Sequence, residues 1–269
     1  MGNNINDGYA DSNRFSDKAL LIYNDFLQSG KFLTHYKWLK NAAETYDIKL
    51  ELMGNSEFLC SYGTSFDKEL IETLGKYRFI LFWDKDIRLG KKFTNICKKI
   101  NIPIYNNIRA IADCDDKSAT YEKIGQWNDC HDTLEQIKMI PTIVAPMTYE
   151  NIGYTDMNFL DKVAEKFGFP LVIKECFGSF GMQVYMAHDM DELKKRVSDI
   201  GGKPMIFQKF IEKSSGFDVR LQVVGDEVVA AMFRYTDDGD FRANITHGGK
   251  MKSYEPDASE IKLATDTVK

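Results

Sequence analysis

Several features that would assign the protein to a common class are missing from its sequence. No apolar run approaches the about 20 residues needed to cross a bilayer, and the densest run, residues 79–83, suits a buried strand. The polar N-terminus has no apolar signal core, so we do not expect secretion. Basic residues are not in excess, with 35 Lys and Arg against 40 Asp and Glu. These absences argue against membrane and nucleic-acid partners and favour the cytoplasm.

Common metal and nucleotide signatures are also missing. The five cysteines form no C-x-x-C pair and the four histidines form no H-E-x-x-H pattern. A disulfide framework or a zinc site is therefore not expected, and we interpret the cysteines as reduced thiols. Neither a Walker A sequence nor G-x-G-x-x-G occurs. A nucleotide site in this chain has to be built from other elements.

Strands and helices alternate through the first part of the chain. Residues 1–17 are polar and rich in Asn, Asp, Ser and Gly, which predicts a flexible extension. Alternating elements favour an α/β fold, here a doubly wound parallel sheet of the Rossmann-like kind over residues 18–110. Strands are predicted at residues 19–23, 48–53, 79–83 and 102–105, with helices at residues 30–46 and 87–100.

The remaining residues, 111–269, predict an α+β domain. Its first helix is expected at residues 113–124 with Asp113 as the N-cap, and a polar stretch at residues 125–132 follows. A hairpin is predicted around Gly225. Further helices are predicted at residues 159–167, 190–200 and 258–269, and strands at residues 140–145, 170–174, 183–187, 205–211, 219–224 and 227–234.

One glycine-bearing turn has the composition of an anion site. Lys174 ends a predicted strand, and Gly178, Ser179 and Gly181 follow it before the next strand. Backbone N–H groups in such a turn form a concave site for phosphate, and the lysine supplies a point charge. An ordinary hairpin turn with a surface lysine is the alternative interpretation of this segment taken alone.

Four further segments make the pattern specific. They read Gln208-Lys-Phe-Ile, Gly216-Phe-Asp-Val-Arg, Val223-Val-Gly-Asp-Glu-Val-Val-Ala-Ala, and Gly239-Asp-Phe-Arg-Ala-Asn with a later Gly248-Gly. In this order and spacing the chain resembles the RimK-like ATP-grasp ligases, from about residue 102 to about residue 255. The resemblance implies an N-terminal pre-ATP-grasp domain followed by an ATP-grasp domain.

The resemblance also implies roles for single residues. Lys117 and Lys174 match lysines on the nucleotide phosphates, with Gly178, Ser179 and Gly181 in the phosphate turn, and Lys209 with Phe210 matches a hinge at the adenine edge. The other implied site residues are a nucleotide contact at Asp218, a catalytic pair at Arg242 and Asn244, and cations for phosphate or carboxylate at Arg220 and Arg234. The alternatives are solvated strand positions for both of those arginines and, for Asp218, a turn residue that pairs with Arg220.

Two departures from the family pattern stand out. An insertion lies near residues 125–134, between Lys117 and the next strand. The family's magnesium ligands, an Asp and a Glu-x-Asn pair, are expected beyond Lys269, so we predict no metal ligand in this chain and a missing C-terminal part of the second domain. On that basis we expect an inactive fragment with an exposed apolar face that self-associates through residues 219–269 as a homo-oligomer. Asp237, Asp238 and Asp240 are interpreted as a solvated turn.

The activity implied by the resemblance is ATP-dependent joining of an amine to a carboxylate through an acyl phosphate, with Mg²⁺ in the complete protein. The expected partners are ATP, an amino acid such as glutamate, and a small-molecule, peptide or protein carboxylate. Two alternatives belong to other classes. One is a non-catalytic nucleotide-binding module that acts through partner binding, and the other is a structural protein that kept the fold and lost the ligand.

Overall fold

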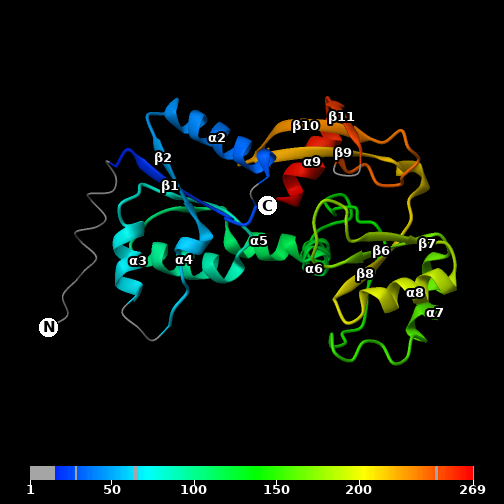
Figure 1. The fold of residues 1–269 in the computed structure, drawn as a ribbon. Coiled ribbons are helices and arrows are strands. Elements are labelled where there is room, and N and C mark those ends of the chain that lie inside the picture. The colour runs from blue at the N-terminus through cyan, green and yellow to red at the C-terminus, as the bar shows by residue number, and fades with distance from the viewer. Residues whose placement is uncertain (1–15, 28, 63–65, 246–247, 269) are drawn as a thin grey trace. The chain divides into compact units, whose positions relative to one another are not determined.

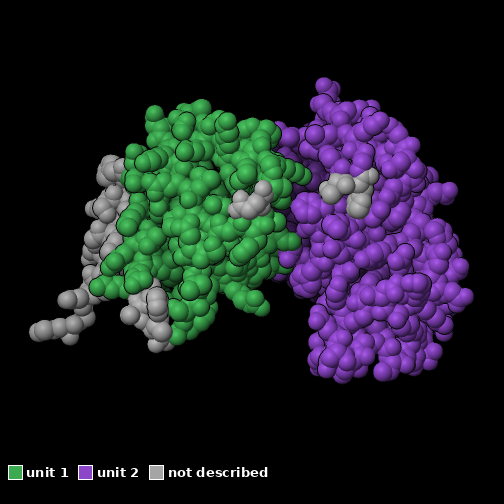
Figure 2. All heavy atoms as spheres, viewed as in Figure 1, with its two compact units in different colours: residues 1–112 green, residues 113–269 purple. Residues whose placement is uncertain are grey.

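The computed structural model describes residues 16–268 except residue 28, residues 63–65 and residues 246–247. The chain divides into two compact units, residues 1–112 and residues 113–269, which Figure 2 shows in different colours. The sequence-based boundary, 110/111, lies two residues earlier. The predicted extension falls almost entirely outside the described residues. In the described part of the chain, no helix is both long and apolar enough to cross a membrane.

A parallel four-stranded sheet forms the centre of the first unit. Its strand order is β2-β1-β3-β4, and every pair is parallel. In β1, four consecutive residues from Ala19 to Ile22 are fully buried, because a parallel sheet is covered on both faces. The strands are β1 (Lys18–Tyr23), β2 (Lys49–Gly54), β3 (Ile80–Trp83) and β4 (Ile104–Tyr105).

Helices cover both faces of this sheet. Leu20 and Ile22 of β1 belong to one apolar cluster with Phe93, whereas Leu21 belongs to another with Tyr36, since successive strand residues point to opposite faces. This is the doubly wound arrangement that the alternating pattern predicts. The helices are α2 (Gly30–Glu44), α3 (Phe66–Leu74), α4 (Ile87–Lys99) and α5 (Ile108–Asp115), with a short 3-10 helix, η2 (Asn55–Glu57). The sequence pattern did not predict α3.

The second unit contains two antiparallel sheets (Figure 1). The first has the order β5-β8-β6-β7, and two helices cover one of its faces, where Ile173 and Phe207 pack against Leu160 and Val197. Lys174 and Gln208 alternate with these core residues, so they lie on the opposite face. The elements are β5 (Thr142–Val144), α7 (Phe159–Phe167), β6 (Leu171–Glu175), β7 (Val184–Ala187), α8 (Met190–Ile200) and β8 (Met205–Lys209).

The other sheet has the order β11-β10-β9. The predicted hairpin is present: β9 and β10 pair in antiparallel fashion around Gly225, whose φ of 62° suits glycine. Helix α9 contacts both strands of the hairpin. The elements are η3 (Glu212–Ser214), β9 (Phe217–Val224), β10 (Glu227–Tyr235), β11 (Lys250–Ser253) and α9 (Ala258–Thr267).

The start of the second unit differs from the prediction. Asp113 lies inside α5 and is not an N-cap; the next helix, α6 (Lys117–Asp129), is capped by Asp116 instead. The Asp116 carboxylate accepts hydrogen bonds from the backbone N–H groups of Ser118 (2.8 Å) and Ala119 (3.4 Å). Helix α6 also continues through Gly125, where a polar stretch was expected. Lys117 is therefore the first residue of a helix.

Candidate functional site

Two lysines from different elements meet at the predicted phosphate turn. The Lys117 ammonium group donates to the carbonyls of Cys176 (3.1 Å) and Gly178 (3.4 Å), and the backbone N–H of Lys117 also donates to Cys176 (3.1 Å). Burial lowers the pKa of Lys174, and the charge of Lys117 lowers it further. Two cations so close, one of them poorly solvated, form a site that an anion would stabilise.

The turn itself requires glycine at two positions. Gly178 has a φ of 157° and Gly181 a φ of 78°. A Cβ atom at Gly178 would lie 2.5 Å from the Gln183 amide oxygen, and one at Gly181 would lie 2.6 Å from the Asn244 amide oxygen. Ser179 lies between the two glycines, and its carbonyl accepts a hydrogen bond from the Met182 N–H (3.3 Å). The turn is thus shaped by side chains that approach it closely.

Arg242 reaches the same turn from the segment after β10. Its Nη1 donates to the Gly181 carbonyl at 3.2 Å, and its Nη2 donates to the Asp240 carboxylate at 2.7 Å. The Asp240 carboxylate raises the pKa of Arg242, so the guanidinium keeps its charge. Asp240 was expected to be a solvated turn residue; that prediction is wrong, because its carboxylate is bonded to Arg242. Arg242 and Asn244 therefore both contact the turn that follows Lys174.

Asp218 and Arg234 form a two-pronged ion pair across β9 and β10. The distances are 2.7 Å from Nε to Oδ1 and 2.5 Å from Nη2 to Oδ2, and the two residues are direct partners in the strand register. The alternative that paired Asp218 with Arg220 in a turn is wrong, since Asp218 lies within β9. Burial lowers the pKa of Arg220, followed by the charge of Arg234.

The predicted hinge lies at the end of β8, whose last residue is Lys209. The backbone N–H of Lys209 donates to the Pro141 carbonyl at 3.1 Å, so this N–H is already used within the protein. Phe210 packs edge-on against Phe241, with ring centroids 6.4 Å apart. A cavity of about 730 Å³ lies beside this ring pair, and Arg242 also lines it. Two carboxylates from residues 238–240 also line it, so the aromatic rings are bordered by charges of both signs.

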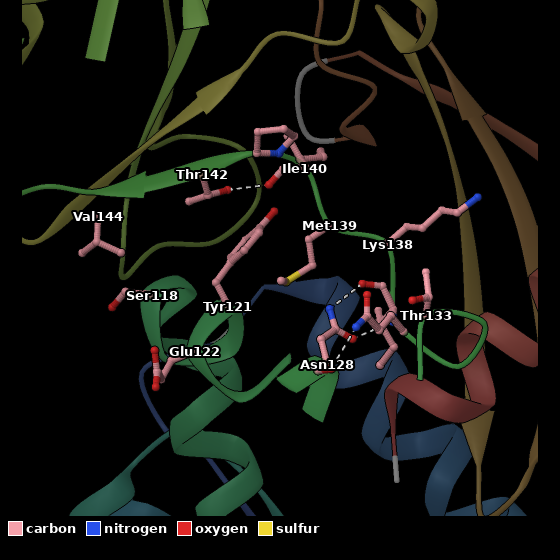
Figure 3. Close-up of a pocket in the computed structure, with 13 residues that line it drawn as sticks. Ser118, Tyr121, Glu122, Asn128, Thr133, Lys138, Met139, Ile140, Thr142 and Val144 are labelled. Carbon is pink, nitrogen blue, oxygen red and sulfur yellow. Dashed lines mark hydrogen bonds between the residues drawn. The ribbon is translucent and has the colours of Figure 1, made fainter. Parts of the chain in front are cut away.

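Gln208, the last residue before the hinge, connects it to a second cavity. The residue is 2% exposed, and its side-chain amide donates to the hydroxyls of Tyr121 (2.6 Å) and Thr142 (2.8 Å). Both hydroxyls line a cavity of about 600 Å³ between α6 and residues 133–144 (Figure 3). Its only charged lining residues among those described are Glu122 and Lys138. This cavity is less suited to phosphate groups than the turn after Lys174.

The predicted insertion forms one wall of this second cavity. Asn128, near the end of α6, holds it with both atoms of its carboxamide: Nδ2 donates to the Ile137 carbonyl (2.9 Å), and Oδ1 accepts from the Ile137 N–H (2.7 Å). Gln136 donates to the carbonyls of Asn128 (3.0 Å) and His131 (3.3 Å). Residues 125–134 are therefore half helix and half a segment folded back onto the helix end.

A family model for the RimK-like ATP-grasp domain matches residues 129–269. The chain belongs to the RimK-like ATP-grasp family. An uncharacterized protein of Mycoplasma pneumoniae is 30% identical over 247 residues, which are 90% of this chain and 79% of that protein. Human N-acetylaspartylglutamate synthase A is 28% identical over 172 residues, 62% of this chain and 38% of the synthase.

The fold of this RimK-like chain also matches solved structures. The D-alanine–D-alanine ligase of Bacillus anthracis in complex with ATP has a TM-score of 0.60 and 17% identity, covering 92% of this chain and 76% of the ligase. At that identity the likeness shows the fold alone. The α/β first unit and the two-sheet second unit of this chain therefore share the fold of that ligase.

The described residues of the RimK-like domain contain no group of three or more His, Cys, Asp or Glu side chains arranged to hold a metal ion. The acidic side chains near the turn are engaged otherwise, Asp240 with Arg242 and Asp218 with Arg234.

Sequence reasoning missed two residues of this RimK-like site. Asp240 accepts hydrogen bonds from Arg242, and its only signal is its place two residues before an arginine in a glycine-containing loop. Gln208 connects the hinge to α6, and its signal is a polar residue directly after three apolar ones in the strand Met205–Lys209. A buried polar side chain needs hydrogen-bond partners, but the sequence does not say which.

Proposed function

We propose that the protein binds ATP at the turn after Lys174 and joins an amine to a carboxylate. The observation that carries this proposal is the convergence of Lys117, Lys174 and Arg242 on residues 176–181. A nucleotide triphosphate carries several negative charges and is bound by clustered cations and N–H donors. Phe210 and Phe241 border a cavity of a size and character that suit the base.

The proposed reaction has two steps. The substrate carboxylate attacks the γ-phosphorus and ADP leaves; the amine then attacks the acyl carbon of the mixed anhydride, loses a proton, and inorganic phosphate leaves. Lys117, Lys174 and Arg242 neutralise charge on the phosphates, which is the main protein contribution in phosphoryl transfer. Burial raises the pKa of the Cys176 thiol, which is unsuited to act as a covalent nucleophile.

Glutamate is the amine that we propose for this reaction. Support comes from the name of the human relative, N-acetylaspartylglutamate synthase A, and from the RimK-like family itself. The carboxylate acceptor is proposed only as a class, a small molecule, peptide or protein. A cytoplasmic location and self-association remain predictions; Phe217, Val219 and Val224 of β9 are 40%, 37% and 68% exposed.

A non-catalytic nucleotide-binding module is the second candidate. The observation that favours it is the lack of a metal-ligand cluster among the described residues, because phosphoryl transfer ordinarily relies on carboxylate-held Mg²⁺. In this version Lys117, Lys174 and Arg242 bind the nucleotide, and occupancy regulates binding of a partner. The two candidates share the nucleotide site and differ in turnover.

Calorimetry and a phosphate-release assay on the 269-residue chain separate the candidates. We expect AMPPNP, a non-hydrolysable ATP analogue, to bind in the presence of Mg²⁺. Phosphate release from ATP that depends on glutamate and a carboxylate acceptor supports the ligase. Binding without such release supports the module. No binding of AMPPNP, ADP or ATP by a folded chain contradicts both.

A further inference from the structure

Arg242 is held along one edge of its guanidinium group. Asp240 accepts from Nε at 3.0 Å and 3.1 Å and from Nη2 at 2.7 Å. The same carboxylate accepts from the backbone N–H of Arg242 at 2.8 Å. The ring of Phe241 lies 5.7 Å from the Arg242 Cζ atom. Because one carboxylate accepts from both the guanidinium and the backbone N–H of Arg242, the arginine side chain has little rotamer freedom left.

Asp240 is itself fixed in the loop. Its backbone N–H donates to the Asp238 carboxylate at 3.0 Å, and its side chain is 23% exposed. The carbonyl of Phe241, between Asp240 and Arg242, accepts from the Gly216 N–H at 3.0 Å. The loop from residue 238 to residue 242 thus presents the carboxylate in a set direction.

The other edge of the guanidinium faces the phosphate turn. Nη1 donates to the Gly181 carbonyl at 3.2 Å. Asn244, two residues further on, lies so close to Gly181 that a Cβ there would be 2.6 Å from its amide oxygen. Nη1 is the donor that a phosphate oxygen entering the turn would compete for, whereas Nε and Nη2 stay with Asp240.

We infer that Asp240 is a positioning residue, which aims Arg242 at the outer phosphates of a bound nucleotide. The inference rests on the proposed nucleotide site and adds the residue that gives it selectivity for triphosphates. Asp240 offsets part of the positive charge of Arg242. Anions are therefore attracted mainly to the edge of the guanidinium that faces the turn, and less to the group as a whole. An arginine without this partner would still attract anions, but it would distinguish a triphosphate from a monophosphate less well.

The test compares AMPPNP and AMP on wild type, Asp240→Asn, Asp240→Glu and Asp237→Asn by calorimetry. Asp237 is the matched control, because it belongs to the same loop but pairs with Lys250. We expect Asp240→Asn to reduce the preference for AMPPNP over AMP by about tenfold or more, the scale of one charge-assisted hydrogen bond. Asp240→Glu should restore part of the preference, and Asp237→Asn should keep it.

A second measurement does not need nucleotide. In the free protein, the Arg242 Nε–H proton should exchange slowly by NMR because Asp240 accepts it, and exchange should be fast in Asp240→Asn. An unchanged AMPPNP-to-AMP ratio in Asp240→Asn overturns the inference and leaves the nucleotide site standing. Equal loss of both affinities indicates a structural role and also overturns it. If wild type does not bind AMPPNP, the proposed function fails. Fast exchange of the Arg242 Nε–H proton in wild type would overturn the positioning contact between Asp240 and Arg242.

Discussion

Two opposing requirements act on the protonation of Lys174. Burial and the charge of Lys117 lower its pKa, but phosphate binding requires the protonated form. Because the folded pKa lies below the unfolded value of 10.5, the unfolded chain holds more protons between the two values. The contribution of Lys174 to the free energy of unfolding therefore rises with pH across that window, whereas nucleotide affinity falls across it.

The first prediction concerns proton uptake at Lys174. Binding of AMPPNP at alkaline pH, between the lowered pKa of Lys174 and 10.5, should take up protons, because the phosphates raise the pKa again. Calorimetry in two buffers with different ionisation enthalpies measures this uptake. The Lys174→Met variant should show less uptake. Equal uptake by wild type and the variant would mean that another group carries the proton.

The charge of Lys174 should also matter for affinity at neutral pH. We expect Lys174→Met to weaken AMPPNP binding by about 1.5–3 kcal/mol, the cost of one charge-assisted hydrogen bond. The control is Lys195→Met, on an exposed helix position that pairs with Asp199. Far-UV circular dichroism checks that both variants fold. An affinity within twofold of wild type in a folded Lys174→Met would remove this residue from the site.

Residues of the site differ in how far the sequence predicts them. The position of Lys174 near a strand end, before a glycine-bearing turn, is predictable from the sequence, whereas its role at a phosphate site stays a prediction. The partner of Arg234 is not, since the pairing with Asp218 depends on the register of β9 and β10. Asp240 escapes prediction for a similar reason: a carboxylate in a loop is solvated unless the loop turns it back onto Arg242.

At the scale of elements, side chains from other segments of the chain hold the turn at residues 176–181. Lys117 donates to two of its carbonyls and Arg242 to a third. Glycine content alone predicts a turn that is mobile until nucleotide binds. These contacts predict a more restricted turn, which exchanges hydrogen-bond partners when phosphate enters.

The third prediction separates backbone strain from crowding in this turn. Gly181→Ala places a Cβ at a φ of 78° and within 2.6 Å of Asn244, whereas Gly201→Ala has a φ of 69° with no atom within 4 Å. Both should lower the free energy of unfolding by about 1–3 kcal/mol, measured by urea denaturation. Only Gly181→Ala should also weaken AMPPNP binding. Equal affinities for the two variants would show that the turn does not contact the nucleotide.

The fourth prediction concerns the segment after α6. Asn128→Ala removes two hydrogen bonds to Ile137, whose side chain is 7% exposed, so we expect a loss of about 1–3 kcal/mol in the free energy of unfolding. Gln126→Ala is the control, because its bond to Glu122 is exposed, and it should change stability by less than about 0.5 kcal/mol. A loss no larger than that of the control would mean that the segment is held by other contacts.

Helix and strand types follow well from local pattern in this chain, whereas their ends do not. Helix α8 begins and ends where periodicity predicts, from Met190 to Ile200, because Asp189 caps it and Gly201 follows it. The start of α6 was misplaced because Asp113 and Asp116 are equally able to cap a helix. They differ in that Asp113 lies within α5 whereas Asp116 follows it, which sequence periodicity does not report.

At the scale of the whole molecule, the two units have separate cores. The apolar clusters around Phe82 and Tyr36 are confined to the first unit, and the cluster around Phe207 to the second. Alternation of strands and helices was enough to predict the parallel sheet. It did not predict which loop residues of the second unit meet at the turn after Lys174, because Arg242 and Gly181 lie 61 residues apart in the chain.

The fifth prediction follows from these separate cores. Saturation with AMPPNP should stabilise the second unit by about 2.7 kcal/mol at a hundredfold excess over Kd, because only the folded site binds it. Hydrogen exchange followed by mass spectrometry should show slower exchange in β6, β8 and residues 176–183, with β1 and β3 unchanged. Arg242 follows β10 and donates a hydrogen bond to the turn between β6 and β7. Hydrogen exchange in β9 and β10 should therefore slow as well. Equal slowing in β1 would mean that the units unfold together, so that stability added at the nucleotide site is shared by the whole chain.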